Sequence, residues 1–450
     1  MIPIIAPEEM AAVDAAAAEP LEVLVERAGA AVAASALDVL GGAYGRRVVV
    51  LAGKGNNGAD GRSAARRLSR RGVRTQVVDA LDSPARLPAC DLVIDAAYGT
   101  GFHGEHHAPE VGATPVLAVD IPSGVSGLTG EVHGRALAAA RTVTFAALKP
   151  GLLFEPGRSL AGDLQVADIG LDVGAVRAGL VQRDDVAAWL PPRPPGSHKW
   201  QAALLVVAGS PGMTGAARLT AAAAQRAGAG MVRAGSPGSD DDRNRPIEAV
   251  GVPLPARGWG EDALAAADRC HAIAVGPGLG ASDATRAGVR ALLSSDLPVL
   301  VDGDGLSVLG DGVTEALAER HAPTVLTPHD GEYARLAGRA PGADRIDAAR
   351  SLAAATGAVV LLKGSPTVVA DPRGEVRVVA AGDARLATAG TGDVLSGVIG
   401  ALLAQGLPAL EAAAAGAWLH GRAGARGPAR GLVAGDLLDL LPLAISEVGR

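Results

Sequence analysis

A run of small residues in the second half of the chain has the form of an anion-binding turn. Residues 387–393, ATAGTGD, precede an apolar stretch, 394–405, that predicts a helix. Backbone amides at a helix N-terminus bind anions, and small residues let the ligand approach them closely. Such amides can stabilise a transferring phosphoryl group while Asp393 accepts a proton from the attacking hydroxyl. We expect Asp393 to be catalytic, because a simple helix cap would not explain the small residues before it.

Three other loops of this half carry glycine or polar residues directly after short apolar runs. They are GPGLG at 276–280, TPHDGE at 327–332 and KGSPT at 363–367. A lone histidine such as His329 often caps a turn, and a lone lysine is often a surface charge. Ligands of α/β proteins, however, bind where the carboxyl ends of several strands meet. The recurrence of these loops therefore favours a nucleotide site.

A polar glycine loop also follows an apolar run in the first half. Residues 53–61, GKGNNGADG, come after the run 48–51 and before a predicted helix. The glycine spacing matches a dinucleotide fingerprint only by letter, which is a weak signal. Three polar side chains on one loop, Asn56, Asn57 and Asp60, favour a site for an anionic ligand over a plain turn.

Two aspartates, Asp95 and Asp120, close the next apolar runs of the first half. Either one alone would be interpreted as a cap. Because they recur at one sheet edge, carboxylate, amide and hydroxyl oxygens from three loops could also ligate a hard cation there. So few carboxylates would suit a cation of low charge.

These loops need parallel strands to bring them together, and two series of short apolar runs supply them. Apolar runs bounded by Gly and Asp, with Ala-rich helical stretches between them, are typical of α/β folds. We therefore predict two doubly wound α/β domains. The expected strands are 47–52, 75–78, 92–95, 116–120 and 142–145 in the first series, and 203–208, 272–276, 299–302, 324–327 and 359–362 in the second, with a hairpin at 368–370 and 376–380.

The chain length of 450 residues predicts two domains, because single cores rarely grow beyond about 300 residues. Residues 191–196, PPRPPG, hold four prolines and cannot continue a helix or a central strand. We take this segment as the linker, which gives domains 1–192 and 197–450.

Composition excludes several classes of protein. The net charge is -7 with acids and bases interspersed, so no basic face is offered to nucleic acid. There are 2 cysteines, one in each half, so neither a disulfide framework nor a thiolate metal site is expected. No apolar run approaches a membrane span, and the first residues have no signal-peptide pattern. We expect a cytoplasmic protein.

The first 190 residues resemble the NAD(P)H-hydrate epimerase domain family. The resemblance rests on LVERAG at 24–29, GKGNNGADG, VIDAAYGTG at 93–101, VDIPSG at 119–124 and LKPGLL at 148–153. It implies a Rossmann-like three-layer sandwich and a potassium site at Asn57, Asp95 and Ser123. The implied substrate contacts are Asn56, Asn57, Gly58, Ala59, Asp60, Gly99, Thr100, Gly101, Phe102, His103, Gly104, Glu105 and Asp120. Ala59 stands where the family usually has glycine.

The substrate of that family carries a hydroxyl at C6 of the reduced nicotinamide ring. Inverting this centre requires either C–O cleavage and re-addition or reversible ring opening, and both routes need acid–base catalysis. By position Asp120 is the first choice for the catalytic group, and Asp60 is the second.

Residues 198–450 resemble the ribokinase-like superfamily, and within it the ADP/ATP-dependent NAD(P)H-hydrate dehydratases. The motifs are SHK at 197–199, the segment 209–232, GPGLG, TPHDGE, KGSPT and the segment 387–406. They imply a ribokinase-like three-layer sandwich, with magnesium as the metal of the nucleotide. The implied nucleotide contacts are Lys363, Gly364, Ser365, Pro366, Thr367 and Gly392, and the implied hydrate contacts are Ala216, Gly278, His329 and Asp393. Asp330 replaces the proline usual after that histidine.

The two halves together predict a bifunctional repair enzyme that epimerises hydrated NADH and NADPH and dehydrates the S form with ADP or ATP. The sequence leaves the choice between ADP and ATP open. The alternative is a ribokinase-like vitamin kinase with a non-catalytic N-terminal nucleotide-binding domain. A non-catalytic scaffold would be favoured by loss of Asp393 or by a basic surface, and the sequence has neither feature. We expect small-molecule substrates and a homo-oligomer.

Overall fold

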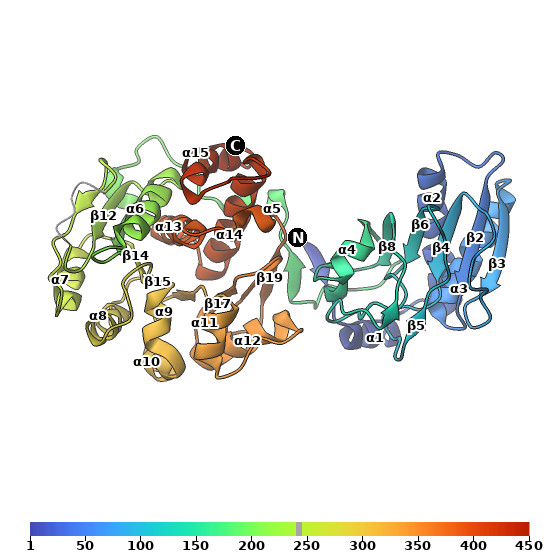
Figure 1. Ribbon diagram of the computed structural model, residues 1–450, viewed down its shortest axis with the longest axis horizontal. Helices are drawn as coiled ribbons and strands as arrows, with labels where there is room; N and C mark the ends of the chain where they lie inside the picture. Colours follow the sequence, from blue (N-terminus) through green and yellow to red (C-terminus); the bar gives the residue numbers. More distant parts are fainter. Residues whose placement is uncertain (240–244, 450) are drawn as a thin grey trace. The chain divides into compact units, whose positions relative to one another are not determined.

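The computed structural model describes residues 1–239 and 245–449 and divides the chain into two compact units, Ile2–Ala178 and Gly179–Arg450 with Met1 (Figure 1). The first unit contains β1 (Ile2–Ile4), α1 (Pro7–Ala15), α2 (Leu21–Leu40), β2 (Arg47–Ala52), α3 (Asn56–Arg70), β3 (Arg74–Asp79), β4 (Leu92–Ala96), β5 (His106–His107), β6 (Val116–Val119), β7 (Gly134–Arg135), β8 (Arg141–Phe145), η1 (Pro150–Leu152), α4 (Gly157–Ala161) and β9 (Asp163–Ala167).

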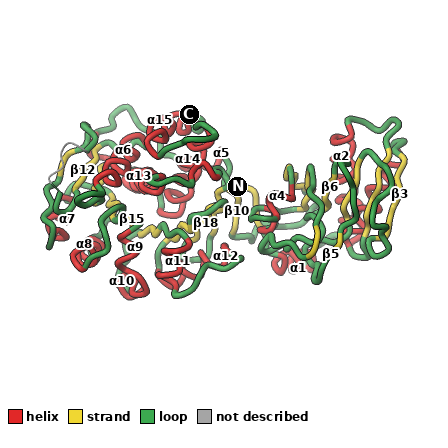
Figure 2. Tube along the Cα trace, viewed as in Figure 1, coloured by secondary structure: helices red, strands yellow, loops and turns green. Residues whose placement is uncertain are grey.

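The six main strands of the first unit form a parallel sheet in the order β3-β2-β4-β6-β8-β9. Alternate residues of each strand face opposite sides of a sheet. Val48 and Val50 of β2 accordingly pack in one core with α2 and α3, whereas Val49 packs in a second core. Loop residues such as Leu87 and Leu137 complete that second core. The third layer is therefore built from loops, drawn green in Figure 2.

The second unit contains α5 (Arg183–Trp189), η2 (Lys199–Ala202), β11 (Ala203–Val207), α6 (Thr214–Arg226), β12 (Met231–Gly235), β13 (Val250–Gly251), α7 (Trp259–Ala266), β14 (Ala272–Val275), α8 (Asp283–Leu293), β15 (Val299–Val301), α9 (Asp304–Leu309), η4 (Gly310–Gly312), α10 (Val313–Leu317), β16 (Thr324–Leu326), α11 (Asp330–Ala337), α12 (Arg345–Thr356), β17 (Val359–Leu362), β18 (Thr367–Ala370), β19 (Val376–Val379), η5 (Ala384–Leu386), α13 (Thr391–Ala404), α14 (Ala409–Arg426) and α15 (Ala434–Ser446). Strand β10 (Ala178–Leu180) lies at the boundary.

The sheet of the second unit runs β19-β18-β17-β16-β15-β14-β11-β12-β13. Strands β11 to β17 pair in parallel, and β17-β18-β19 pair antiparallel, which confirms the predicted hairpin. Helices α6, α13 and α14 lie on one side of this sheet and α9, α11 and α12 on the other (Figure 1). Covered on both faces, the strands are buried nearly throughout, as parallel strands usually are.

Two features differ from the sequence-based prediction. The units divide between Ala178 and Gly179, ahead of the proline-rich segment expected to be the linker. The reason is packing: Val181 and Val186 belong to the core of the second unit, and the Val181 amide donates to the Val378 carbonyl at 2.9 Å. Several short or edge strands were also not predicted, among them β9 and β12, whose apolar patterns polar or charged residues interrupt.

Candidate active sites

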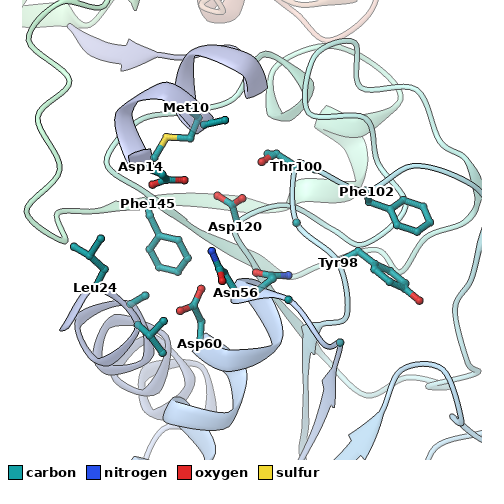
Figure 3. A pocket seen from close by; sticks show the side chains of 18 of the residues that line it. Met10, Asp14, Leu24, Asn56, Asp60, Tyr98, Thr100, Phe102, Asp120 and Phe145 are labelled. Carbon is teal, nitrogen blue, oxygen red and sulfur yellow. The ribbon is translucent and has the colours of Figure 1, made fainter. Parts of the chain in front are cut away.

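A cavity of about 650 Å³ lies in the first unit (Figure 3). Its walls come from α1, α2, the first turn of α3 and the loops that follow β2, β4 and β6. The chain places β3 and β4 on opposite sides of β2, so the cavity lies where the strand order reverses. Doubly wound sheets bind their ligands at such a switch point.

Most of the predicted substrate contacts line this cavity. They are Asn56, Asn57, Asp60, Gly99, Thr100, Gly101, Phe102, His103 and Asp120. Gly58, Ala59, Gly104 and Glu105 do not line it. Gly58 instead shapes the turn, because a Cβ there would lie 1.9 Å from the Gly53 carbonyl oxygen. The Glu105 side chain is 77% exposed, and its Oε2 lies 3.8 Å from Nε2 of His107.

Asp120 is held by a buried ammonium. Its backbone has a φ of 67°, which is rare for a residue other than glycine and marks a constrained position. Its Oδ1 lies 2.6 Å from Nζ of Lys149, whose side chain is 1% exposed. The Thr144 hydroxyl donates to the same oxygen at 3.1 Å. Lys149 belongs to the LKPGLL motif, but the sequence does not indicate its partner, which only the fold reveals.

Two more carboxyl groups face the same space. Figure 3 shows Asp14 and Asp60 directed toward Asp120, one from α1 and the other from α3. Burial, followed by the charges of Asp120 and Asp14, raises the pKa of Asp60 to about 8. Burial also raises the pKa of Asp14. Asp14 was missed because no motif surrounds it in the sequence.

Of the three residues predicted to bind a cation, Asp95 and Ser123 are joined by hydrogen bonds, whereas the side chain of Asn57 has no hydrogen bond to either. The Ser123 hydroxyl donates to Asp95 at 2.6 Å, the Ser123 amide donates to its other oxygen at 2.9 Å, and both side chains are fully buried. The side-chain nitrogen and oxygen of Asn57 are buried without a partner among the described residues. Burial raises the pKa of Asp95 despite these hydrogen bonds.

A second acidic cluster lies in the second unit around Lys363. Nζ of Lys363 donates to Asp302 at 2.5 Å, and the Ser396 hydroxyl donates to the other oxygen of Asp302 at 2.6 Å. A Cβ on Gly392 would lie 3.6 Å from that Nζ and 3.9 Å from Asp302. The structure therefore joins the KGSPT loop to the N-terminus of α13, where Asp393 stands. Asp302 ends a predicted strand, and this position is the sequence signal that points to it.

The charges of this cluster shift one another. Burial, reinforced by Asp302, raises the pKa of Asp393 to about 6. Burial opposes ionisation of Asp302, but the Lys363 ammonium and the hydrogen bonds from Ser396 and Thr327 together outweigh it and lower the pKa of that carboxyl. Burial likewise opposes the charge on Lys363, and Asp302 and Glu332 together raise its pKa. Asp393 is thus set to gain or lose a proton near neutrality while the ion pair stays charged.

The remaining predicted residues have structural roles that the contacts make explicit. Gly278 has a φ of 64°, and a Cβ there would lie 2.7 Å from that of Ala216, so these two predicted hydrate contacts are neighbours. His329 caps α11, with its Nδ1 accepting from the Gly331 amide at 3.0 Å. The Thr367 hydroxyl donates to the Gly364 carbonyl at 3.1 Å, which closes the KGSPT turn.

The unusual Asp330 does not leave an unpaired charge. Arg345 donates to both of its carboxylate oxygens at 2.9 and 3.1 Å. The same guanidinium donates to the Lys363 carbonyl at 2.7 Å. Arg345 therefore connects the start of α11 with the end of β17.

Two classes of feature are absent from the described part of the chain. Residues 1–239 and 245–449 contain no group of three His, Cys, Asp or Glu side chains arranged to hold a metal. Within those ranges no helix combines the length and the apolar character needed to cross a bilayer.

Comparison with known proteins covers both units. The NAD(P)H-hydrate dehydratase family model matches residues 204–445, and the YjeF-related protein N-terminus model matches 21–85 and 76–151. The bifunctional NAD(P)H-hydrate repair enzyme Nnr of Mycobacterium tuberculosis is 46% identical over 83% of this chain and 82% of that protein. The Escherichia coli enzyme of the same name is 34% identical over 93% of this chain and 88% of that protein.

A solved structure extends this result to the fold of the second unit. The ADP/ATP-dependent NAD(P)H-hydrate dehydratase of Bacillus subtilis, co-crystallised with ATP and Mg²⁺, is 32% identical, with a TM-score of 0.53 over 59% of this chain and 97% of that one. A ribokinase-like protein of Enterococcus faecalis, 22% identical with a TM-score of 0.54, shares the fold. The chain belongs to the family of bifunctional NAD(P)H-hydrate repair enzymes.

Proposed function

We propose that the first unit epimerises the R and S forms of hydrated NADH and NADPH, and that the second unit dehydrates the S form with ADP or ATP. The observation that carries this proposal is the match of both units, in one chain, to the bifunctional repair enzymes. The alternative of a vitamin kinase with a non-catalytic N-terminal domain finds no comparable support.

The chemistry of the second unit begins with the C6 hydroxyl, because hydroxide is a poor leaving group. Asp393 accepts the hydroxyl proton as its oxygen attacks the terminal phosphorus of the nucleotide. Backbone amides at the start of α13 stabilise charge on the transferring group. Phosphate then leaves, driven by the N1 lone pair, and loss of a C5 proton restores the reduced ring. ADP would yield AMP and phosphate, and ATP would yield ADP and phosphate.

Nucleotide and hydrate have separate sets of contacts in this proposal. The nucleotide would be bound by Lys363, Gly364, Ser365, Pro366, Thr367 and Gly392. The hydrate would contact Ala216, Gly278, His329 and Asp393. Support comes from Gly392, whose lack of a side chain leaves space beside the Lys363 ammonium.

Magnesium fits the second unit as the partner of the nucleotide. The described residues offer no three-residue metal cage, and Mg²⁺ commonly binds through substrate phosphates with few protein ligands. The related Bacillus subtilis dehydratase was crystallised with ATP and Mg²⁺. The ion would supply neutralisation of the phosphate charge beside Lys363 and Asp393.

Potassium fits the first unit beside the side chain of Asn57, which lines the cavity. The buried, unpartnered amide oxygen of Asn57 favours a ligand there, since such groups rarely stay unsatisfied. Asp95 and Ser123 would supply the other oxygens. The ion would offset the charge of Asp95 where an anionic substrate binds.

Location and assembly complete the proposal. We place the enzyme in the cytoplasm, where its two free cysteines would stay reduced. We also propose a homo-oligomer, which light scattering of the purified protein would test.

The decisive experiment supplies the purified chain with each epimer of hydrated NADH, potassium, magnesium and either ADP or ATP. The reduced-nicotinamide absorbance should reappear from the S epimer directly, and from the R epimer after epimerisation. Omitting the nucleotide should leave epimerisation and stop dehydration. No absorbance change under any combination would refute the proposal.

A further inference from the structure

The cavity of the first unit gathers more acid–base groups than binding an anionic substrate would require. Besides Asp60, its titratable lining consists of Asp14, Glu19, Lys54, Tyr98, His103, Asp120 and Lys149. Three carboxyl groups face one space: Asp14 of α1, Asp60 of α3 and Asp120 of the loop after β6 (Figure 3). Only two of the groups are joined directly, Asp120 and Lys149. The three carboxyls are therefore in unlike environments.

Lys149 holds Asp120 as a carboxylate. Its ammonium donates to the Thr144 hydroxyl at 2.9 Å and to the Phe145 and Ala147 carbonyls at 3.1 and 3.3 Å, besides its contact with Asp120 at 2.6 Å. These acceptors satisfy a buried cation, and the carboxylate balances its charge. Protonating Asp120 would leave the ammonium buried without a counter-ion.

Asp60 has the opposite environment. It is 7% exposed, and among the residues that the structure describes no cation pairs with it. The nearby Arg62 donates instead to the Gly53 carbonyl at 2.7 Å. The charges that act on Asp60 most strongly are the carboxyls of Asp120 and Asp14, which add to the effect of burial. Asp60 therefore keeps its proton at neutral pH.

We propose that Asp60 is the general acid and Asp120 the general base of the epimerase, and that Lys149 is the positioning residue that keeps the two carboxyls in opposite protonation states. The inference rests on the proposed epimerase function and deepens it. Environments that separate two carboxyls in this way are how enzymes assign acid and base roles.

This pair fits reversible ring opening. Asp120 takes the proton of the C6 hydroxyl, and the electrons of the O–H bond form the C6 carbonyl. The C6–N1 bond then breaks, its electron pair passes to N1, and N1 takes the proton of Asp60. After rotation about C5–C6, N1 attacks the other face of C6, returns its proton to Asp60, and the carbonyl oxygen regains its proton from Asp120. Both carboxyls end as they began. Loss of hydroxide and re-addition of water would leave the two carboxyls exchanged and would require a further proton exchange with solvent before the next turnover. We therefore assign ring opening, which needs no such step.

The test measures epimerisation by the full-length chain against pH. The parent kcat/KM should fall above about pH 8, where Asp60 loses its proton. Asp60→Asn should lower kcat about 10²–10⁴-fold, the usual worth of an acid or base. Lys149→Met should change the acidic limb of this profile, because the Asp120 carboxylate then lacks the ammonium that balances its charge. It should also lower kcat more than it changes KM.

Controls separate this inference from folding and from the proposed function. Arg70→Met removes a positive charge from an exposed position outside the cavity and should keep the parent profile. Dehydration of the S epimer by each variant reports an intact second unit. Carbon-13 NMR of the free protein should show one aspartate carboxyl titrating near pH 8 that disappears in Asp60→Asn.

Provided that the parent epimerises, either of two results would overturn the inference. One is a pH profile of Lys149→Met that has the same acidic and basic limbs as the parent. The other is an epimerisation rate of Asp60→Asn within about threefold of the parent, well short of the expected loss. A parent that does not interconvert the epimers would instead refute the epimerase function itself, and the NMR titration would still decide the protonation state of Asp60.

Discussion

The ammonium of Lys363 lies 2.5 Å from Oδ1 of Asp302, a carboxylate that is 2% exposed at the end of β15. Ser396 of α13 donates to the other oxygen of the same carboxylate. One buried residue thus connects the KGSPT loop after β17 with the helix that carries Asp393. The residues that we propose as catalytic and nucleotide-binding in the second unit depend on this connection for their relative positions.

Replacing Asp302 should therefore weaken both stability and nucleotide use. Asp302→Asn leaves Lys363 without its counter-ion. Breaking a fully buried ion pair lowers the free energy of unfolding by about 3–5 kcal/mol, and because Lys363 is partly exposed we expect a loss of about 2 kcal/mol. We expect kcat/KM for the nucleotide to fall about tenfold, or about 1.4 kcal/mol. Urea unfolding and steady-state kinetics would measure the two effects, with the exposed Asp311→Asn as the control. Parent-like values in both would mean that the ion pair positions nothing.

Asp393→Asn should abolish dehydration and spare epimerisation, because Asp393 belongs to the second unit only. Loss of a general base commonly costs about 10²–10⁴-fold in rate. Rates of both reactions measured on one preparation would check this. Dehydration at the parent rate would identify Asp393 as a helix cap.

The pKa of Asp393 also predicts the pH dependence of dehydration. Burial and Asp302 raise it to about 6, and a base acts only in its ionised form. The kcat/KM should therefore rise with pH up to about 6 and level off above it. A profile that is flat down to pH 4.5, where a carboxyl with that pKa is mostly protonated, would contradict the assignment.

Asp95→Ala should slow epimerisation and weaken its dependence on potassium. The substitution removes a fully buried carboxylate that Ser123 holds by two hydrogen bonds. Dehydration of the S epimer should stay unchanged and serves as the internal control. Both rates would be measured with and without potassium, and an equal potassium dependence in parent and variant would place the cation elsewhere.

Gly58→Ala should disrupt the first cavity, since the new Cβ would lie 1.9 Å from the Gly53 carbonyl oxygen. We expect the first unit to lose about 1–3 kcal/mol of unfolding free energy, as overpacked sites do, and epimerisation to fall with it. The neighbouring Ala59→Gly, which restores the glycine usual in this family, should change stability by about 1 kcal/mol or less. Thermal unfolding of both variants would compare them, and equal stability would show that the loop accommodates the methyl group.

The sequence by itself determined the class of the fold and the loops of both sites. Short apolar runs with a glycine or aspartate at their carboxyl ends indicate buried parallel strands. Such strands are buried on both faces, so nearly all of their residues must be apolar. The ATAGTGD run likewise predicted the start of α13, because small residues before an apolar helix have few other uses. These signals are local in the chain, and so the sequence alone revealed them.

The tertiary structure decided which side chains meet. Lys149 and Asp120 are 29 positions apart, and Asp14 and Asp60 come from different helices. Their spacing in the sequence therefore does not indicate that they line one cavity. The boundary between the units also depended on packing: the core of the second unit takes Val186, whereas the composition favoured the prolines. Charge states follow the same rule, because burial and neighbouring charges exist only once the chain has folded.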